Sequence, residues 1–306
     1  MNRRFETGEL RTFVETTLGF KVRSFERLPG RSASVNFKAV RVEDGFPFVV
    51  KCLTGRAVLR LPQLLRNLQE LQGSMAVSRL FAEFPAQFGD WSVVYLSWCA
   101  GERRFPDRLS AAEFQQFLDD YLAFSQRLQR VNGVLPELSF WHWGRELAGA
   151  GKGWRQGLLD RRIRQLANDP VAPHLAERLQ VVHGDFHAGN FLFSAGRIAG
   201  IFDLTDLRKG YPTEDLVRYF SSALEHVSPL AFVRRRKLFA RFAEAVTRLP
   251  YSRREWLTAV SVYQLYKASS LWEPQVGWGK LLKFFGKMRT YERLRQVILS
   301  VGEAST

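Results

Sequence analysis

A dense group of polar side chains lies in the stretch VVHGDFHAGNFLF, residues 181–193. Asp185 and Asn190 stand five residues apart between two apolar runs, and His183 and His187 flank Asp185. A buried polar group without a partner costs roughly 1 to 3 kcal/mol, so polar residues packed this closely rarely serve packing alone. The stretch therefore predicts a functional loop between two short strands.

A second carboxylate, Asp203, follows the strand-like segment AGIF, thirteen residues after Asn190. A hairpin that turns at SAGR can bring Asp203 back toward the loop. A carboxylate and an amide oxygen are hard ligands that suit Mg²⁺, which completes its octahedron with water and substrate phosphates. Asp185 can then accept a proton from a hydroxyl group, so the three residues predict a site for phosphoryl transfer.

The cation that such a site needs for the phosphates is found upstream, in the segment FPFVVKCL. Lys51 ends a β-branched run and has strongly apolar neighbours on both sides. A lysine on an edge strand that extends its ammonium group to water would give the same pattern. We expect Glu70, in the helix that follows, to pair with Lys51; Glu83 and a solvated helix face are the alternatives.

The segments around these residues predict a β-rich first part and a mainly helical second part. Three antiparallel strands are expected between Val22 and Leu53, because the turn signals PG and EDG separate β-branched and aromatic runs. A helix is expected over 61–81, with Pro62 in its first turn, and a strand over 91–101. Later helices are expected at 110–131, capped by Ser110 and Glu113, and at 158–169, 230–249, 254–272 and 279–301, with a strand at 197–204.

This order of elements predicts an α+β fold with two lobes, residues 1–96 and residues 97–306. The 306 residues include 46% apolar side chains, enough for a sizeable core. The two cysteines, Cys52 and Cys99, are too few for a disulfide framework and favour a cytoplasmic protein. No run approaches the roughly 18 apolar residues of a membrane-spanning helix.

The order of the motifs resembles the aminoglycoside phosphotransferase and choline kinase group of the protein-kinase-like fold. It runs from Lys51 on a strand, through a helix with an acid and a hinge ending in AGE, to HGDFHAGN and GIFD. The resemblance covers most of residues 25–220. It implies an ATP-dependent kinase of a small molecule, with Asp185 as the catalytic residue and Asn190 and Asp203 as ligands of Mg²⁺.

The resemblance also implies how the nucleotide is held. Backbone groups of Ser97 and Cys99, at the hinge, are expected to bind adenine. The loop LPGRSASVN, with Gly30 and Ser32, is expected to cover the phosphates, although its single glycine is equally typical of an ordinary hairpin turn.

Three further residues are expected to have structural roles. His183 matches the first histidine of the family motif, which orders the loop, and His187 is interpreted as a capped loop residue. Asp215 resembles the structural Asp that tethers the catalytic loop in this family. The segment FDLTD departs from the family pattern, because Thr205 stands where a glycine is expected.

The net charge of +15 bears on the acceptor, since it biases the surface toward anionic partners. A polycationic acceptor such as an aminoglycoside calls for carboxylates in its cleft. The predicted helical lobe instead carries three basic clusters: Arg145, Lys152, Arg155, Arg161, Arg162 and Arg164; Arg234, Arg235, Arg236 and Lys237; and Lys280, Lys283, Lys287, Arg289, Arg293 and Arg295. We therefore expect a neutral or anionic hydroxyl acceptor.

The most specific version of this hypothesis is a sugar of a lipopolysaccharide core, because kinases of those sugars have a related fold and act at an anionic membrane face. The segment 278–299 can lie on such a face with its apolar side, although a buried helix with a solvated basic face explains it equally well. That apolar side comprises Leu281, Phe284, Phe285, Met288, Tyr291 and Ile298. An aminoglycoside or amino-alcohol kinase is the alternative. A non-catalytic pseudokinase is disfavoured because Asp185, Asn190 and Asp203 are all present, and a nucleic-acid partner is not expected because no basic reading element is seen.

Overall fold

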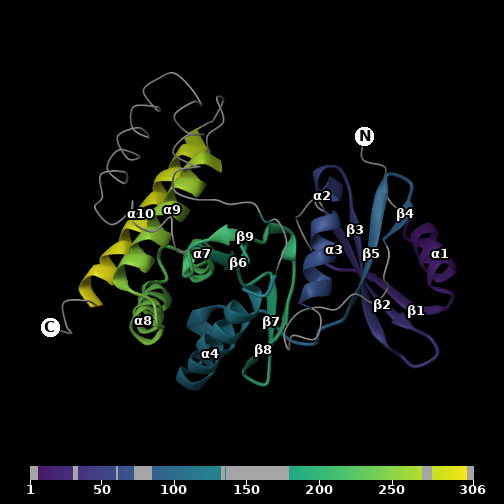
Figure 1. The fold of residues 1–306 in the computed structure, drawn as a ribbon, viewed down its shortest axis with the longest axis horizontal. Coiled ribbons are helices and arrows are strands. Elements are labelled where there is room, and N and C mark those ends of the chain that lie inside the picture. Colours follow the sequence, from purple (N-terminus) through teal and green to yellow (C-terminus); the bar gives the residue numbers. More distant parts are fainter. Residues whose placement is uncertain are drawn as a thin grey trace. The chain divides into compact units, whose positions relative to one another are not determined.

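The computed structural model describes residues 6–29, 34–59, 61–71, 85–131, 135, 179–270 and 278–301. These residues fall into two compact units (Figure 1). One unit comprises Met1–Gly101 with Ala199–Thr205, and the other comprises Glu102–Ile198 with Asp206–Thr306. The expected α+β fold class is confirmed, since the first unit is built on a sheet and the second is mainly helical. The division into lobes at residue 96 stays a prediction.

The first unit contains a five-stranded antiparallel sheet in the order β1-β2-β3-β5-β4. The three strands expected between Val22 and Leu53 are present, and β3 lies at the centre of the sheet. The strand expected over 91–101 ends earlier, at Ser97. The strands are β1 Val22–Arg27, β2 Ser34–Arg41, β3 Pro47–Leu53, β4 Ala86–Phe88 and β5 Trp91–Ser97.

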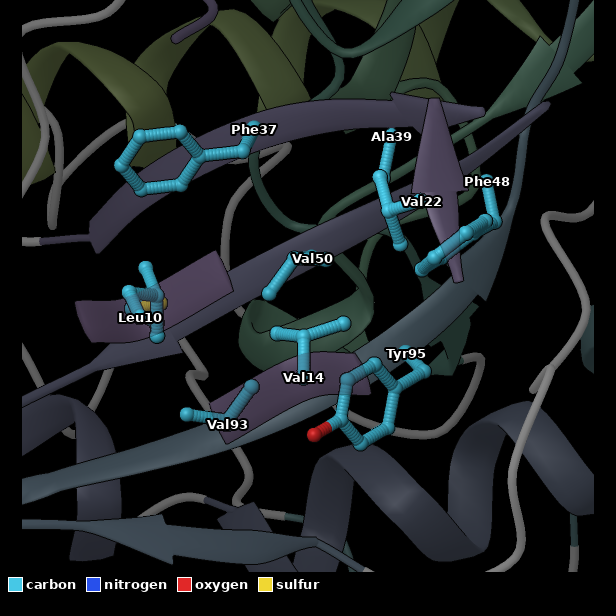
Figure 2. Close-up of a cluster of buried hydrophobic side chains, with 10 residues drawn as sticks. Leu10, Val14, Val22, Phe37, Ala39, Phe48, Val50, Val93 and Tyr95 are labelled. Carbon is cyan, nitrogen blue, oxygen red and sulfur yellow. The ribbon is translucent and has the colours of Figure 1, made fainter. Parts of the chain in front are cut away.

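An N-terminal helix that the sequence reading missed, α1 (Thr7–Leu18), packs on this sheet. Leu10 and Val14 of α1 are fully buried in one cluster with side chains of β1, β2, β3 and β5, as Figure 2 shows. The signal was available, because Leu10, Phe13, Val14 and Leu18 recur at helical spacing. Charged residues between these apolar positions made the helical pattern less clear. Helix α1 therefore completes the core on one side of the sheet.

Two helices follow the strand β3, namely α2 (Arg56–Leu59) and α3 (Leu61–Glu70). Helix α3 begins where the leucine pattern predicts, with Pro62 in its first turn, where its missing amide costs no hydrogen bond. The expected remainder, residues 72–81, lies outside the described residues. The buried face of α3 contains three leucines and one polar residue, Asn67.

The described residues after Gly101 form five helices and two small strand pairs. The capping box predicted at α4 is present: the Ser110 hydroxyl accepts from the Glu113 amide at 3.2 Å, and the Ser110 amide donates to the Glu113 carboxylate at 2.8 Å. Helix α7 was not predicted, and the helix expected over 158–169 lies outside the described residues. The helices are α4 Ala111–Leu128, α7 Glu214–His226, α8 Phe232–Arg248, α9 Arg253–Ser270 and α10 Trp278–Val301; the short elements are η1 Pro106–Arg108, β6 Gln180–Val182, β7 Phe191–Ser194, β8 Arg197–Ile201, η3 Leu204–Asp206 and β9 Arg208–Gly210.

Helix α10 packs on α8 and α9. Tyr291 and Ile298, which were expected on a membrane-facing side, are fully buried. Over its described side chains, α10 is therefore a core helix, the alternative that the sequence left open. Among the described residues, no helix is long and apolar enough to span a bilayer.

The burial of α1 gives a test of its contribution to the fold. Replacing Leu10 by Ala should lower the free energy of unfolding by about 2 to 5 kcal/mol, because it removes buried methyl groups and leaves a cavity against the sheet. Urea unfolding followed by circular dichroism measures this change. Glu9→Ala, on the exposed side of the same helix, is the control and should change the free energy by less than about 0.5 kcal/mol. Equal effects of the two substitutions would show that α1 adds nothing to the core.

Candidate active site

The loop between β6 and β7, residues 183–190, is held in place by helix α7. The carboxylate of Asp215 accepts hydrogen bonds from the backbone amides of His183 at 2.8 Å and of Gly184 at 2.9 Å. Burial raises the pKa of this carboxyl group, and the charge of His183 and the two amide bonds oppose the shift. The tethering role expected for Asp215 matches this geometry.

Gly184 has a steric reason to be glycine. Its φ is +82°, a left-handed conformation that side chains disfavour. A Cβ at this position would lie 2.0 Å from Nη1 of Arg208 and 2.1 Å from the carbonyl oxygen of Asp206. Arg208 is itself buried and paired with Glu214, so it has little room to move. Gly184 therefore lies directly against the backbone of Asp206 and the side chain of Arg208.

Phe186 anchors the loop to helix α4. Its ring is fully buried and stacks on Phe191 with ring centroids 4.6 Å apart. It also contacts the rings of Tyr121 and Phe117 from α4. The residue after Asp185 is therefore fixed in an aromatic core, while Asp185 itself keeps 31% of its side chain exposed.

Three neighbours surround the carboxylate of Asp185. Nε of Arg218 donates to Oδ1 at 3.0 Å, and Nε2 of His187 lies 3.3 Å from Oδ2. The side-chain amide nitrogen of Asn190 donates to the Asp185 carbonyl oxygen at 2.9 Å and lies 3.3 Å from Oδ2. Burial raises the pKa of Asp185, but the hydrogen bond from His187 and the charge of Arg218 outweigh it and lower the pKa overall. Asp185 is therefore ionised at neutral pH.

The hydrogen bonds of His187 define its tautomer. Nδ1 accepts from the amide of Gly189 at 3.0 Å, so a neutral ring carries its hydrogen on Nε2 and donates it to Asp185. His187 is thus more than the capped loop residue expected from the sequence. Asn190 commits its amide nitrogen to Asp185, so its carbonyl oxygen is the group that it can offer to a cation.

Arg218 is a site residue that the sequence reading missed. It lies three residues after Asp215 on α7, so both side chains project from one face of the helix toward the loop. The guanidinium group is largely buried and lies over the ring of Tyr263, 5.8 Å from its centroid. The signal in the sequence was the spacing of an acid and an arginine by three residues, but only the fold shows which carboxylate the arginine meets.

Within the first unit, the ammonium group of Lys51 binds Asp203, with Nζ 2.8 Å from Oδ1. Lys51 pairs with Asn36 of β2 and Val94 of β5, so it lies on a central strand and the edge-strand alternative is excluded. Asp203 has a φ of +58°, an uncommon conformation for a residue with a side chain. The Thr205 hydroxyl donates to Oδ1 of Asp203 at 3.0 Å, which gives the unexpected threonine a role.

Helix α3 contributes Asn67 to the surroundings of Asp203. Its side-chain nitrogen donates to the carbonyl oxygen of Leu204 at 3.0 Å, and its oxygen accepts from Gln63 at 2.7 Å. A polar residue on the buried face of a helix was the signal for this contact. Glu70 ends α3 with an exposed side chain, so the carboxylate that the structure places on Lys51 is Asp203, and a pairing with Glu70 stays a prediction.

The hinge residues follow the last strand of the sheet. Ser97 ends β5 opposite Phe48, and the ladder of the sheet stops before Cys99. Cys99 packs closely on Gly200, where an added Cβ would lie 2.8 Å from the sulfur atom. Gly30 and Ser32 of the expected phosphate loop lie outside the described residues, and the binding of adenine at the hinge stays a prediction.

Comparison with known proteins agrees with this fold. The solved structures that are similar to the chain include two aminoglycoside phosphotransferases and a spectinomycin phosphotransferase. The complex of APH(4)-Ia with AMP-PNP and hygromycin B has a TM-score of 0.65 at 13% identity, covering 97% of this chain and 100% of that one. The complex of APH(9)-Ia with ADP and spectinomycin has a TM-score of 0.63 at 10% identity, covering 98% of this chain and 99% of that one. ADP-bound APH(2'')-Ib has a TM-score of 0.60 at 17% identity, covering 95% of this chain and 98% of that one.

At these identities the likeness shows the fold, which is that of a phosphotransferase with protein-kinase-like architecture. The model of the phosphotransferase enzyme family matches residues 18–254, more than half of the sequence. The chain belongs to this family, so it is an enzyme that transfers phosphoryl groups. No sequence among the curated proteins matches it.

The contact between Arg218 and Asp185 predicts a pH effect. Arg218→Gln removes a positive charge next to the partly buried Asp185, so the pKa of Asp185 should rise and the acid limb of the rate should move to higher pH. The pH profile of phosphate release measures this shift. Arg218→Lys keeps the charge and should leave the limb near its wild-type position. An unchanged acid limb in Arg218→Gln would exclude an electrostatic role for Arg218.

Proposed function

We propose that the protein is a small-molecule kinase that transfers the γ-phosphate of Mg-ATP to a hydroxyl group of a sugar-like acceptor. The observation that carries the proposal is the ionised carboxylate of Asp185, fixed in direction by Arg218 and His187 on a rigid loop. The structural neighbours that bind ADP or AMP-PNP support ATP as the donor. This interpretation uses each polar residue of the loop.

The residues proposed to hold the cation fit that role chemically. Asp203 has a carboxylate with a side-chain exposure of 36%, and Asn190 can offer its carbonyl oxygen. Both are hard oxygen donors of the kind that Mg²⁺ prefers. Among the described residues no group of three His, Cys, Asp or Glu side chains can hold a metal, so the remaining ligands would be water and phosphate oxygens. A bound Mg²⁺ would neutralise the charge of the phosphates during transfer.

Lys51 is proposed to hold the phosphates of the nucleotide. Its ammonium group is fixed on a central strand and bound to Asp203, so its position is set before any ligand arrives. The backbone of Ser97 and Cys99 is proposed to hold adenine, and Gly30 and Ser32 to cover the phosphates. Positioning of this kind supplies most of the catalysis in phosphoryl transfer, because little covalent chemistry falls to the protein.

Asp185 is proposed to accept a hydrogen bond from the acceptor hydroxyl and to direct its oxygen at the γ-phosphorus. As the new P–O bond forms and the bond to the leaving diphosphate oxygen breaks, the hydroxyl proton passes to the carboxylate. The low pKa of Asp185 makes it a weak base, so the proton leaves late. This agrees with the loose transition state described for phosphoryl transfer.

The acceptor is proposed to be neutral or anionic, with a lipopolysaccharide core sugar as the most specific candidate. The excess of basic residues in the chain supports this class. The cluster from Arg145 to Arg164 lies outside the described residues. Hygromycin B and spectinomycin, which the structural neighbours bind, make an aminoglycoside the alternative.

The cation site gives the first test. ATP with Mg²⁺ should raise the melting temperature, and Asp203→Ala should abolish the part of the shift that depends on Mg²⁺, because it removes a carboxylate ligand. Differential scanning fluorimetry with and without EDTA measures both. Asp206→Ala, which changes a nearby acid outside the proposed ligand set, is the matched control. If ATP stabilises Asp203→Ala as strongly as the wild type, the ligand assignment is wrong.

The catalytic carboxylate gives the second test. Asp185→Asn should keep the affinity for ATP and lower turnover roughly 10²- to 10⁴-fold, the usual contribution of a positioned proton acceptor. A product screen over lipopolysaccharide fragments, neutral sugars, choline and aminoglycosides identifies the acceptor, and the variant is then assayed with it. Turnover near the wild-type value would exclude the role of Asp185. Efficient transfer to aminoglycosides without transfer to anionic sugars would establish the alternative acceptor class.

A further inference from the structure

Exposed apolar side chains gather where α7 passes into α8. Leu230, Phe232 and Val233 have exposed fractions of 80%, 73% and 83%. They are three of the six large apolar residues that are exposed in the described part of the chain, and they lie within four positions of one another. Single exposed apolar residues are ordinary, but such a group within one turn marks an interaction surface.

The same face of α8 continues with positive charge. Arg236 follows Phe232 by four residues and Lys237 follows Val233 by four, so each base lies one turn behind an apolar side chain. Both bases are exposed. We call Leu230, Phe232, Val233, Arg236 and Lys237 the α8 face. The opposite side of the helix is the core side, where Leu238, Phe242 and Ala245 are fully buried.

Two arginines of the same run fix the orientation of this face. Nε of Arg234 binds Oδ2 of Asp107 at 2.6 Å, and Nη1 of Arg235 donates to the carbonyl oxygen of Leu224 at 3.1 Å. Figure 1 shows that α8 packs beside α10 in this unit. The first turn of α8 is thus held from within, which leaves its outer side chains presented on a rigid element.

The charges near the α8 face are predominantly positive. Arg108, next to Asp107 in η1, has an exposed side chain, and Arg293 of α10 is close enough to act on the charge of Arg235. Described acids of these helices are paired: Asp107 is buried against Arg234, and Glu225 pairs with Lys287 at 3.2 Å. An anionic partner would therefore meet little repulsion here.

We propose that the α8 face binds the surface of an anionic lipid bilayer. The exposed bases lie one helical turn, about 5.4 Å along the axis, from the exposed apolar side chains, so both kinds of side chain can meet the same surface. At an anionic bilayer the apolar side chains can enter the headgroup and acyl boundary while the bases pair with lipid phosphates. A stable protein partner calls for an interface of roughly 1,000 Å² or more, far larger than three apolar side chains.

This inference deepens the proposed acceptor class, because a sugar linked to a lipid would be encountered at such a surface. It replaces the expected membrane face on α10, whose described apolar residues Tyr291 and Ile298 lie in the core. Vesicle binding is measured without nucleotide or acceptor, so its failure would leave the kinase proposal standing. Conversely, Asp185→Asn should bind vesicles as the wild type does even though it loses turnover.

The experiment is sedimentation of the full chain with vesicles of phosphatidylcholine alone or mixed equally with phosphatidylglycerol. Binding is expected with the anionic vesicles and should weaken as salt rises. Phe232→Ser with Val233→Ser, and Arg236→Glu with Lys237→Glu, should each lower the partition coefficient at least about tenfold. Unchanged melting temperatures would show that these variants are folded.

Two control variants make the same kinds of substitution at exposed positions of the first unit. Leu59→Ser removes an apolar side chain that is 81% exposed, and Arg23→Glu with Arg27→Glu reverses two exposed charges on β1. Both should retain wild-type binding. Equal losses in the controls would show attraction by overall charge and overturn the proposal, as would absence of binding to anionic vesicles. Self-association in sedimentation velocity that Phe232→Ser with Val233→Ser removes, without vesicle binding, would assign the face to a second copy instead.

Discussion

The two hydrogen bonds that Asp215 accepts from the backbone of the loop are the contact on which the active site depends. A strand-to-strand loop with buried amides must satisfy them, and each unsatisfied amide would cost roughly 1 to 3 kcal/mol. The same turn of α7 carries Arg218, which binds Asp185. One helix therefore fixes both the backbone of the loop and the direction of its reactive carboxylate. Phe186, the residue after Asp185, is fully buried and so holds the loop in the aromatic core.

Among the described residues, one buried ion pair differs in exposure from the two pairs of the candidate site. Arg208 and Glu214 are both buried, with side-chain exposures of 6% and 2%, so no ligand can reach them and they serve the fold. Asp185 and Asp203 keep 31% and 36% of their side chains exposed while their cations, Arg218 and Lys51, are much more buried. A carboxylate that is held by a buried cation and open to solvent on its other side is preorganised for a ligand.

The basic run at the start of α8 shows how neighbouring arginines take different roles. Arg234 and Arg235 turn inward, to Asp107 and to carbonyl oxygens at the end of α7, and they fix the helix. Arg236 and Lys237 turn outward, because a helix rotates its side chains by about 100° per residue. Net charge alone therefore overstates the number of bases that can contact a partner. The helix period determines which basic side chains point to solvent.

The sequence by itself determined the elements that depend on local patterns. The strands between Val22 and Leu53, the start of α3 and the capping box of α4 were predicted because turn residues, leucine spacing and side-chain caps act within a few residues. The motif also identified Asp185, Asn190 and Asp203 as candidate residues. The expected site assignments that involve Gly30 and Ser32 remain predictions.

Only the tertiary structure decided which groups meet. Lys51 and Asp203 are 152 residues apart, and Asp185 and Arg218 are 33 apart, so no local rule pairs them. The pairing of Glu70 with Lys51 stays a prediction, while the fold brings Asp203 to Lys51 and Asn67 of α3 to Leu204. Likewise the apolar residues of α10 were consistent with core or membrane until packing buried Tyr291 and Ile298. Burial depends on what the rest of the chain brings to a surface, and a pattern of residue types does not contain that information.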